Sequence, residues 1–267
     1  MEKIESVSRL TKDLITAAAT LSKDEARFLV DTYYEMQNNR IRAAHQVRAL
    51  SENQEPCDVL HWLQSQSDVL ERQISRALDK YSAADPVGAW SREVRGVGPI
   101  IAAGLLAHID IEQAPTVGHI WRFAGLDPTS KWGKGEKRPW NAKLKTLCWK
   151  LGESFVKQSG HESAFYGHIY LARKEYEQGK NDSLEYKDQA DERVKKVGKS
   201  TDAFKHYSEG RLPPGHIHAR AKRYAVKLFL AHWHEMAYKY LLGKSPPLPY
   251  PIAHMENHTH KIEVPTH

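Results

Sequence analysis

Basic side chains alternate with tryptophans in the segment GLDPTSKWGKGEKRPWNAKLK, residues 125–145. Trp132 and Trp140 are flanked by Lys131, Lys134, Lys137, Arg138, Lys143 and Lys145. Lys and Arg neutralise phosphates, and indole rings stack on unpaired bases. The segment therefore suits contact with single-stranded, bent or branched nucleic acid. The alternative is a solvated cationic loop whose two tryptophans dock into the core.

A second candidate site is the stretch EVRGVGPIIAAGLLAHID, residues 93–110. Gly96 and Gly98 permit a tight turn with positive φ, and Pro99 suits the first position of a new helix. The stretch therefore predicts a helix, a tight hairpin and a second helix. Backbone N–H groups at the start of the second helix would attract a phosphate without reading base sequence. The predicted contact residues are Gly96, Val97, Gly98, Pro99 and Ile100.

The spacing of Val94, Gly96, Val97, Gly98, Ala102 and Leu105 or Leu106 resembles the helix-hairpin-helix DNA-binding motif. This resemblance implies a monovalent cation that bridges carbonyls of residues 94–99 and a DNA phosphate. The alternative is an ordinary turn between two helices. GHIWRFAGL, residues 118–126, also resembles a helix of the DNA glycosylases that use this motif. Ile100 and Val117 occupy the positions of their catalytic lysine and aspartate, which disfavours that chemistry.

A closer resemblance is to RNA-guided insertion-sequence transposases that join a RuvC-like domain, a coiled coil and a helix-hairpin-helix domain. Their last domain is similar to this chain in the order and spacing of three segments. These are VGPIIAA, then FAGLDP at residues 123–128, and then a basic loop that leads into a helix. The match covers about residues 60–155. The mainly helical residues that precede the hairpin leave no room for the RuvC-like domain. The RuvC-like metal-dependent nuclease activity is therefore not expected.

The serine nucleophile of that family lies in a Ser-Gly-rich run, whereas this chain has TSKWGKGEKR. Ser130 is the only serine there and is a weak catalytic candidate. Lys137 and Arg138 could supply positive charge, but a serine also needs an activating group, and the sequence indicates none.

Histidines are frequent in the last fifty residues. His232 and His234 are two positions apart, so they point in nearly opposite directions on a helix and cannot share a metal. A His-x-His pair binds metal better in extended chain, which leaves His254, His258 and His260 as weak metal candidates. The alternative is that these histidines form local hydrogen bonds or titrate beside phosphates.

The composition places the chain among globular proteins with an excess of positive charge. It has 267 residues, 40% hydrophobic and 27% charged, and a formal net charge of +6. Two cysteines, Cys57 and Cys148, predict neither a disulfide framework nor a cysteine zinc site. A long apolar run and a signal-peptide pattern are both absent from the sequence. We expect a cytoplasmic protein without a membrane partner.

The elements that must position these sites are helical, so the predicted fold class is mainly α. Ser22 and Glu25 form a capping-box pattern that opens a long helix. A second helix is predicted from heptad-like spacing of Leu63, Leu70, Ile74, Ala77 and Tyr81. The two helices are expected to form an antiparallel hairpin and to offer a surface for homo-oligomerisation.

Helical periodicity is also clear at residues 142–158 and 216–242. In the latter, one apolar stripe is predicted to contain Val226, Phe229, Leu230, Trp233, Ala237, Tyr240 and Leu241, beside a basic stripe of Arg220, Arg223 and Lys227. We expect a coiled-coil-like region over 1–90, a helix-hairpin-helix domain over 91–160, a helical region over 161–243 and an extended Pro/His-rich tail over 244–267.

These patterns together favour a non-catalytic DNA-binding protein related to mobile-element transposases, encoded by a mobile element or a phage. Its expected partners are DNA, including branched DNA, with RNA as an alternative, and further copies of itself. Apart from the cation at the hairpin, no cofactor is expected. Two other functions stay open: a strand-exchange enzyme with a serine nucleophile, and a protein-interaction adaptor in which the hairpin only packs helices.

Overall fold

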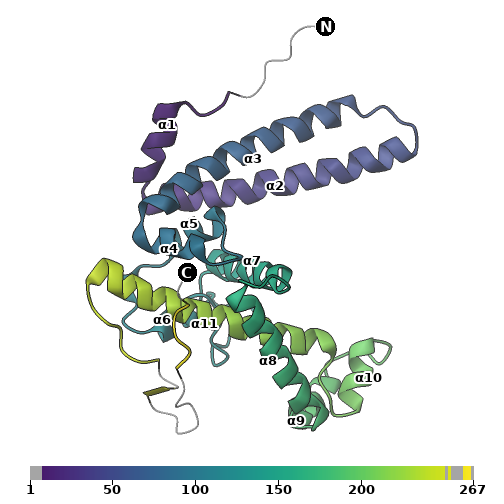
Figure 1. Ribbon diagram of the computed structural model, residues 1–267. Coiled ribbons are helices and arrows are strands. Elements are labelled where there is room, and N and C mark those ends of the chain that lie inside the picture. Colours follow the sequence, from purple (N-terminus) through teal and green to yellow (C-terminus); the bar gives the residue numbers. More distant parts are fainter. Residues whose placement is uncertain (1–7, 250–251, 254–260, 266–267) are drawn as a thin grey trace. The chain divides into compact units, whose positions relative to one another are not determined.

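The computed structural model describes residues 8–249, 252–253 and 261–265. Within these ranges every regular element is a helix, which confirms the mainly α fold class (Figure 1). The chain divides into two compact units. The N-terminal unit comprises 1–92 and 98–110, and the C-terminal unit comprises 93–97 and 111–267. No described helix combines the length and the apolar character needed to cross a membrane.

The N-terminal unit is built on a long antiparallel pair of helices, α2 and α3, as predicted (Figure 1). The capping box at Ser22 and Glu25 is present at the start of α2. The helices of this unit are α1 (Lys12–Ala17), the 3-10 helix η1 (Ala18–Thr20), α2 (Lys23–Glu52), α3 (Asp58–Ala84), α4 (Pro86–Glu93) and α5 (Pro99–His108).

The contact register of α3 differs from the predicted heptad. Leu63 and Leu70, two members of the heptad-like series, are 43% and 37% exposed, so these two positions are not buried between α2 and α3. The residues that α3 buries in this half are Ser67 and Glu71. Glu71 Oε2 accepts a hydrogen bond of 2.6 Å from Arg40 Nε on α2. A polar pair therefore occupies a position that apolar periodicity assigns to a leucine.

Helix α5 is buried on all sides from Ile100 to His108. Ile100 and Ala103 pack with Val30 and Leu78 of the long helices. A Cβ on Gly88 of α4 would lie 2.7 Å from Leu106 Cδ1 and 2.2 Å from the Ser82 carbonyl oxygen. Gly88 is therefore required for α4 to approach α3 and α5.

The C-terminal unit is organised around the long helix α11, against which α7 and α8 pack (Figure 1). The rings of Phe155, Tyr166 and Phe229 meet in its core at centroid distances of 5.0–5.7 Å. The elements are η2 (Ile111–Gln113), α6 (Val117–Phe123), α7 (Ala142–Gln158), α8 (Phe165–Asp182), α9 (Lys187–Val194), α10 (Asp202–Ser208) and α11 (Pro214–Leu242).

The predicted apolar stripe of α11 is correct over most of its length. Val226, Phe229, Leu230, Trp233 and Ala237 are buried. Tyr240 and Leu241 are 46% and 44% exposed, so the prediction was wrong for these two. The helix ends directly afterwards at Gly243, which has φ of 62°, and a last turn has fewer neighbours to cover it.

A buried carboxylate joins α8 to α11. Glu177 accepts hydrogen bonds from Arg173 (2.8 Å), Tyr186 (2.5 Å) and Arg220 (2.6 Å). Burial alone would raise the pKa of Glu177, but these three donors stabilise the anion and the net effect is a lowered pKa. Arg220 is thereby engaged inside the protein.

Candidate nucleic-acid interface

The basic segment 125–145 is fixed at both ends. At its start, Gly125 has φ of 64°, and a Cβ there would lie 2.8 Å from Trp140 Cγ, so the indole packs directly on the glycine backbone. At its end, the Asn141 N–H donates to the Phe123 carbonyl (2.9 Å). The Asn141 side chain caps α7 by accepting from the Leu144 N–H at 3.0 Å. The loop is therefore a defined support for its side chains.

Two cations and two indoles form a continuous row on this support. The Trp132 and Trp140 rings meet edge to face at a centroid distance of 6.3 Å. Arg138 Cζ lies 4.9 Å from the Trp132 centroid, and Lys145 Nζ lies 4.1 Å from the Trp140 centroid. We call these four residues the cation–indole row. Each cation is held over a ring rather than beside a carboxylate.

The two tryptophans of the row differ in exposure. Trp132 is 45% exposed, and its Nε1–H donates to the Glu136 carbonyl at 2.8 Å. Trp140 is half-buried. Trp132 is thus not docked into the core. Arg138 lies over its ring, and the exposed part of the ring is accessible to a stacking partner.

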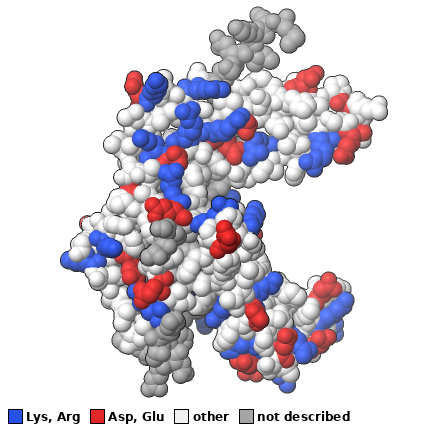
Figure 2. All heavy atoms as spheres, in the orientation of Figure 1, with Lys and Arg blue, Asp and Glu red and all other residues white. Residues whose placement is uncertain are grey.

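Three lysines of the loop carry positive charge that no ion pair neutralises in the described structure. Lys131, Lys134 and Lys137 are exposed, and no ion pair joins them to a carboxylate among the described residues. Glu136 is the only acid between residues 128 and 145, and its carboxylate accepts the Gly133 N–H at 2.8 Å. By contrast, basic and acidic side chains are interspersed over α9 and α10 (Figure 2).

The three residues of the predicted basic stripe of α11 have three different surroundings. Arg220 is bound to Glu177, as described above. Arg223 is exposed and has no ion pair in the described part of the chain. Lys227 Nζ lies 4.1 Å from the Trp121 centroid, and its carbonyl accepts the Trp121 Nε1–H at 3.0 Å.

The pKa shifts of these cations reflect their proximity. Partial burial lowers the pKa of Lys145, and the nearby charges of Arg138 and Arg223 lower it further. Partial burial likewise lowers the pKa of Arg223, the charge of Arg220 lowers it further, and the charge of Glu177 raises it. Like charges therefore gather here, and Glu177 offsets part of their repulsion at Arg223.

The hairpin between α4 and α5 has the predicted outline, but its two glycines differ. Gly96 has φ of 99°, and a Cβ there would lie 3.1 Å from Phe155 Cδ1. Gly98 has φ of −88°, which any residue adopts, so the positive φ that this pair of glycines permits is used at Gly96 and not at Gly98. A Cβ on Gly98 would meet no atom within 4 Å. Nothing inside the protein requires a glycine there.

At two of the predicted contact positions, Val97 and Ile100, the side chain is buried and only the backbone is available to a ligand. Val97 and Ile100 are 5% and 7% exposed, so their side chains belong to the core. Pro99 stands in the first turn of α5, and Gly98 provides no side-chain cap for that turn. The first-turn amides thus lack a side-chain acceptor.

The hairpin carbonyls implied as cation ligands already have donors. Val94 O accepts from the Val97 N–H (2.9 Å), and Gly98 O accepts from the Ala102 N–H (3.0 Å). Gly96 O accepts from Ser154 Oγ at 2.6 Å. A cation at residues 94–99 stays a prediction and would use the remaining lone pairs.

Ser130 lacks the surroundings of a nucleophile. Its Oγ is buried and has no hydrogen-bond partner in the described structure. The nearest turn acid, Asp127, accepts instead from the Thr129 N–H (2.9 Å) and Thr129 Oγ1 (2.8 Å). No group is therefore placed to remove a proton from Ser130.

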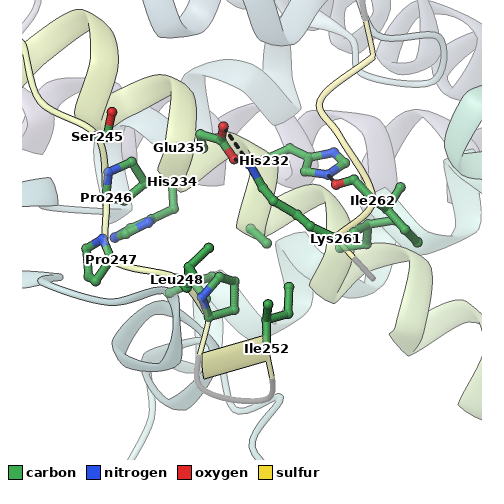
Figure 3. Close-up of a pocket in the computed structure, with 14 residues that line it drawn as sticks. His232, His234, Glu235, Ser245, Pro246, Pro247, Leu248, Ile252, Lys261 and Ile262 are labelled. Atoms are coloured by element: carbon green, nitrogen blue, oxygen red, sulfur yellow. Dashed lines mark hydrogen bonds and ion pairs between the residues drawn. The ribbon is translucent and has the colours of Figure 1, made fainter. Parts of the chain in front are cut away.

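The histidines of α11 serve as hydrogen-bonding groups. His232 Nε2 pairs with the Ile262 carbonyl, and His234 Nε2 pairs with the Ala114 carbonyl, each at 2.8 Å. Figure 3 shows both beside a pocket of about 270 Å³ between α11 and the tail, closed partly by the Lys261–Glu235 ion pair. No group of metal-ligating side chains occurs among the described residues. His254, His258 and His260 lie outside them.

Sequence reasoning missed two residues beside the row. Trp149 on α7 is 57% exposed, and Lys222 Nζ on α11 lies 5.3 Å from its ring centroid. One signal was available in the sequence: Trp149 follows Lys145 by four residues on a helix, so the two share a face. The approach of α11 to this face was not readable from the sequence.

Comparison with known proteins gives no match to a family model, a curated protein or a solved structure. The resemblance to the insertion-sequence transposases therefore stays a prediction based on the quoted motifs.

Proposed function

We propose that this protein is a non-catalytic DNA-binding protein that grips phosphates and exposed bases. The observation that carries the proposal is the cation–indole row together with Arg223. Arg138, Lys145 and Arg223 lie close together and form no ion pair with a carboxylate in the described structure, beside an exposed Trp132 ring. A polyanion that also offers flat apolar rings complements both properties.

The chemistry of the row favours single-stranded or branched DNA over regular duplex. Indole rings can stack only on bases that are not already stacked on both sides, and such bases occur at single strands and junctions. No element of the row presents a donor and acceptor pattern that would read a base pair. The proposed recognition is thus of DNA shape and strand state rather than of sequence.

The hairpin is proposed as a second phosphate contact. Its support is the uncapped first turn of α5 and the open space over Gly98. The motif order that resembles the transposase domain is consistent with this role and with an origin in a mobile element or phage. The proposal also includes self-association through the N-terminal helices.

The test measures binding of the purified protein to labelled single strand, duplex and four-way junction over a salt series. We expect affinity to fall steeply with salt and to be highest for the single strand or the junction. The double variant Arg138→Gln/Lys145→Gln should weaken binding. The variant Lys195→Gln/Lys196→Gln, which removes the same charge from exposed lysines after α9, should not.

Two outcomes would replace the proposal. A covalent protein–DNA product on a denaturing gel would favour the strand-exchange enzyme. No binding at low salt would favour the protein-interaction adaptor, in which the hairpin serves only to pack helices.

A further inference from the structure

A second feature of the C-terminal unit is a pocket of about 250 Å³ next to the cation–indole row. Its walls come from the start of the basic segment, from α7 and from α11. The lining residues are Gly125, Leu126, Lys145, Cys148, Trp149, Ala219, Lys222, Arg223 and Val226. Lys145 belongs both to the row and to the pocket, so the two are continuous.

The base of the pocket is apolar and chemically inert. Leu126, Ala219 and Val226 contribute hydrocarbon surface. Cys148 is buried, and burial raises the pKa of its thiol to about 12. A thiol that stays protonated is a poor nucleophile, so the pocket is built to bind rather than to react.

The rim combines free positive charge with an exposed aromatic ring. Lys145 and Arg223 form no ion pair among the described residues, whereas Lys222 forms an ion pair with Glu153. Lys222 also lies over one part of the Trp149 ring, which is still 57% exposed. The pocket thus offers two unneutralised cations and one aromatic surface.

These features define the class of ligand. The two cations are suited to bind one anion, such as a phosphate, from two sides. The aromatic ring and the apolar base are suited to contact a flat apolar group. The volume is slightly below the range of about 300–1,000 Å³ for pockets that hold drug-sized ligands, which limits the occupant to a small group. A single nucleotide combines a phosphate and a planar ring.

We propose that the pocket receives one unstacked nucleotide from the DNA strand held by the cation–indole row, with its phosphate on Lys145 and Arg223 and its base against Trp149. The inference rests on the proposed function and makes it more specific. It explains why the row ends at a pocket, since one base leaving the strand would fix the position of the strand along the row.

The experiment compares two oligonucleotides of equal length, one of thymidine and one in which every nucleotide is abasic. Both carry the same phosphates, but only the first carries bases. Trp149→Ala should weaken binding of the thymidine strand about 5- to 150-fold, the range for one stacked base, and leave binding of the abasic strand unchanged. Trp149→Phe should restore part of the loss.

The matched control is Tyr176→Ala on α8. Tyr176 is 53% exposed and has Arg173 over its ring at 4.7 Å, so it reproduces the setting of Trp149 outside the pocket. We expect this variant to bind both strands as the unaltered protein does. Circular dichroism of all variants checks that they are folded.

The outcomes separate the two proposals. If the unaltered protein binds neither strand at low salt, the proposed function fails. If it binds both strands but Trp149→Ala has no effect, or has equal effects on both, the pocket proposal alone is overturned. Calorimetry with free thymidine monophosphate provides a further arm: tight binding of the mononucleotide that displaces no strand would overturn the link between pocket and row.

Discussion

At the scale of single residues, the uneven pairing of cations on α11 is the most informative feature. Arg220 and Arg223 are three positions apart, yet Arg220 forms an ion pair with Glu177, whereas Arg223 forms none in the described structure and is repelled by Arg220. Like charges held together oppose folding, so this arrangement adds nothing to stability. It is consistent with binding of an anion from outside the protein.

The two arginines should respond oppositely to substitution. Arg223→Gln is expected to leave the free energy of unfolding unchanged or slightly higher, because it relieves repulsion. It should also reduce the slope of log affinity against log salt by about 1, the value for one lost phosphate contact. Arg220→Gln should lower stability, because Glu177 loses a donor. Denaturant unfolding and salt-series binding measure both effects, and a stability loss in Arg223→Gln would contradict this assignment.

Substitutions of Gly98 by Asp and by Asn test the effect of a negative charge, because the two side chains have nearly the same shape. Asp and Asn are nearly equal as helix N-caps, and the φ of −88° suits both, so Gly98→Asp and Gly98→Asn should fold equally well. If a phosphate approaches the first turn of α5, the added anion should weaken DNA binding about tenfold more than the neutral amide does, since about 1.4 kcal/mol of repulsion corresponds to that factor. Equal affinities of the two variants would remove the hairpin from the interface.

At the scale of elements, local signals were sufficient where a helix has clear ends. The boundaries 142–158 follow from Asn141 as a cap, and the end of α11 follows from Gly243. The register of α3 was not predictable in the same way. Its buried positions include Glu71. A charged residue is rarely buried without a partner, so the sequence does not predict burial of Glu71 unless its partner is known. Arg40, the partner, lies 31 residues away.

The candidate site was predictable in composition but not in arrangement. The sequence shows lysines and tryptophans in one loop, but not which ring each cation covers. The pocket depends on Lys222 and Arg223 approaching Trp149 from another helix, and no local pattern relates segments about 70 residues apart. The special φ of Gly96, by contrast, is a local property and was correctly predicted.

The Glu177 cluster gives a stability prediction for the contact between α8 and α11. Glu177→Gln should lower the free energy of unfolding by about 2 kcal/mol, because two arginines lose their counter-ion. The value is below the ~3–5 kcal/mol for fully buried pairs, since both arginines are partly exposed. The control is Glu185→Gln, whose pair with Lys180 has a half-exposed carboxylate and should contribute less than the Glu177 cluster does. Equal losses by urea denaturation would contradict a special role of Glu177.

The same cluster predicts how the free energy of unfolding depends on pH in the acid range. The pKa of Glu177 is lowered in the folded protein, so its contribution is fully present above the ordinary carboxyl pKa of about 4.3 and is lost as pH falls through the lowered value. Between pH 5 and pH 2, the unaltered protein should therefore lose more stability than Glu177→Gln does. If the unfolding free energies of the unaltered protein and of Glu177→Gln change in parallel with pH, the Glu177 carboxylate is not stabilised in the folded protein.

At the scale of the whole molecule, each unit offers a surface to a partner. The C-terminal unit carries the cation–indole row, and the long helices of the N-terminal unit expose apolar side chains. On α3, Val59, Trp62, Leu63 and Leu70 are 76%, 46%, 43% and 37% exposed. Their spacing of three, one and seven residues follows one side of a helix, a pattern typical of a helix that packs against another one.

A second copy of the chain is the partner we propose for this side of α3. If two copies associate there, Trp62→Glu should convert a dimer to a monomer in analytical ultracentrifugation, because a buried carboxylate without a partner opposes association. Gln64→Glu, a half-buried position on the same turn of α3, adds the same charge as a control and should leave the dimer intact. The loss of dimer should also lower the apparent affinity for a four-way junction, which offers several arms to two binding units, more than the affinity for a short single strand. A chain that sediments as a monomer before substitution would remove self-association from the proposal while leaving the DNA-binding row untouched.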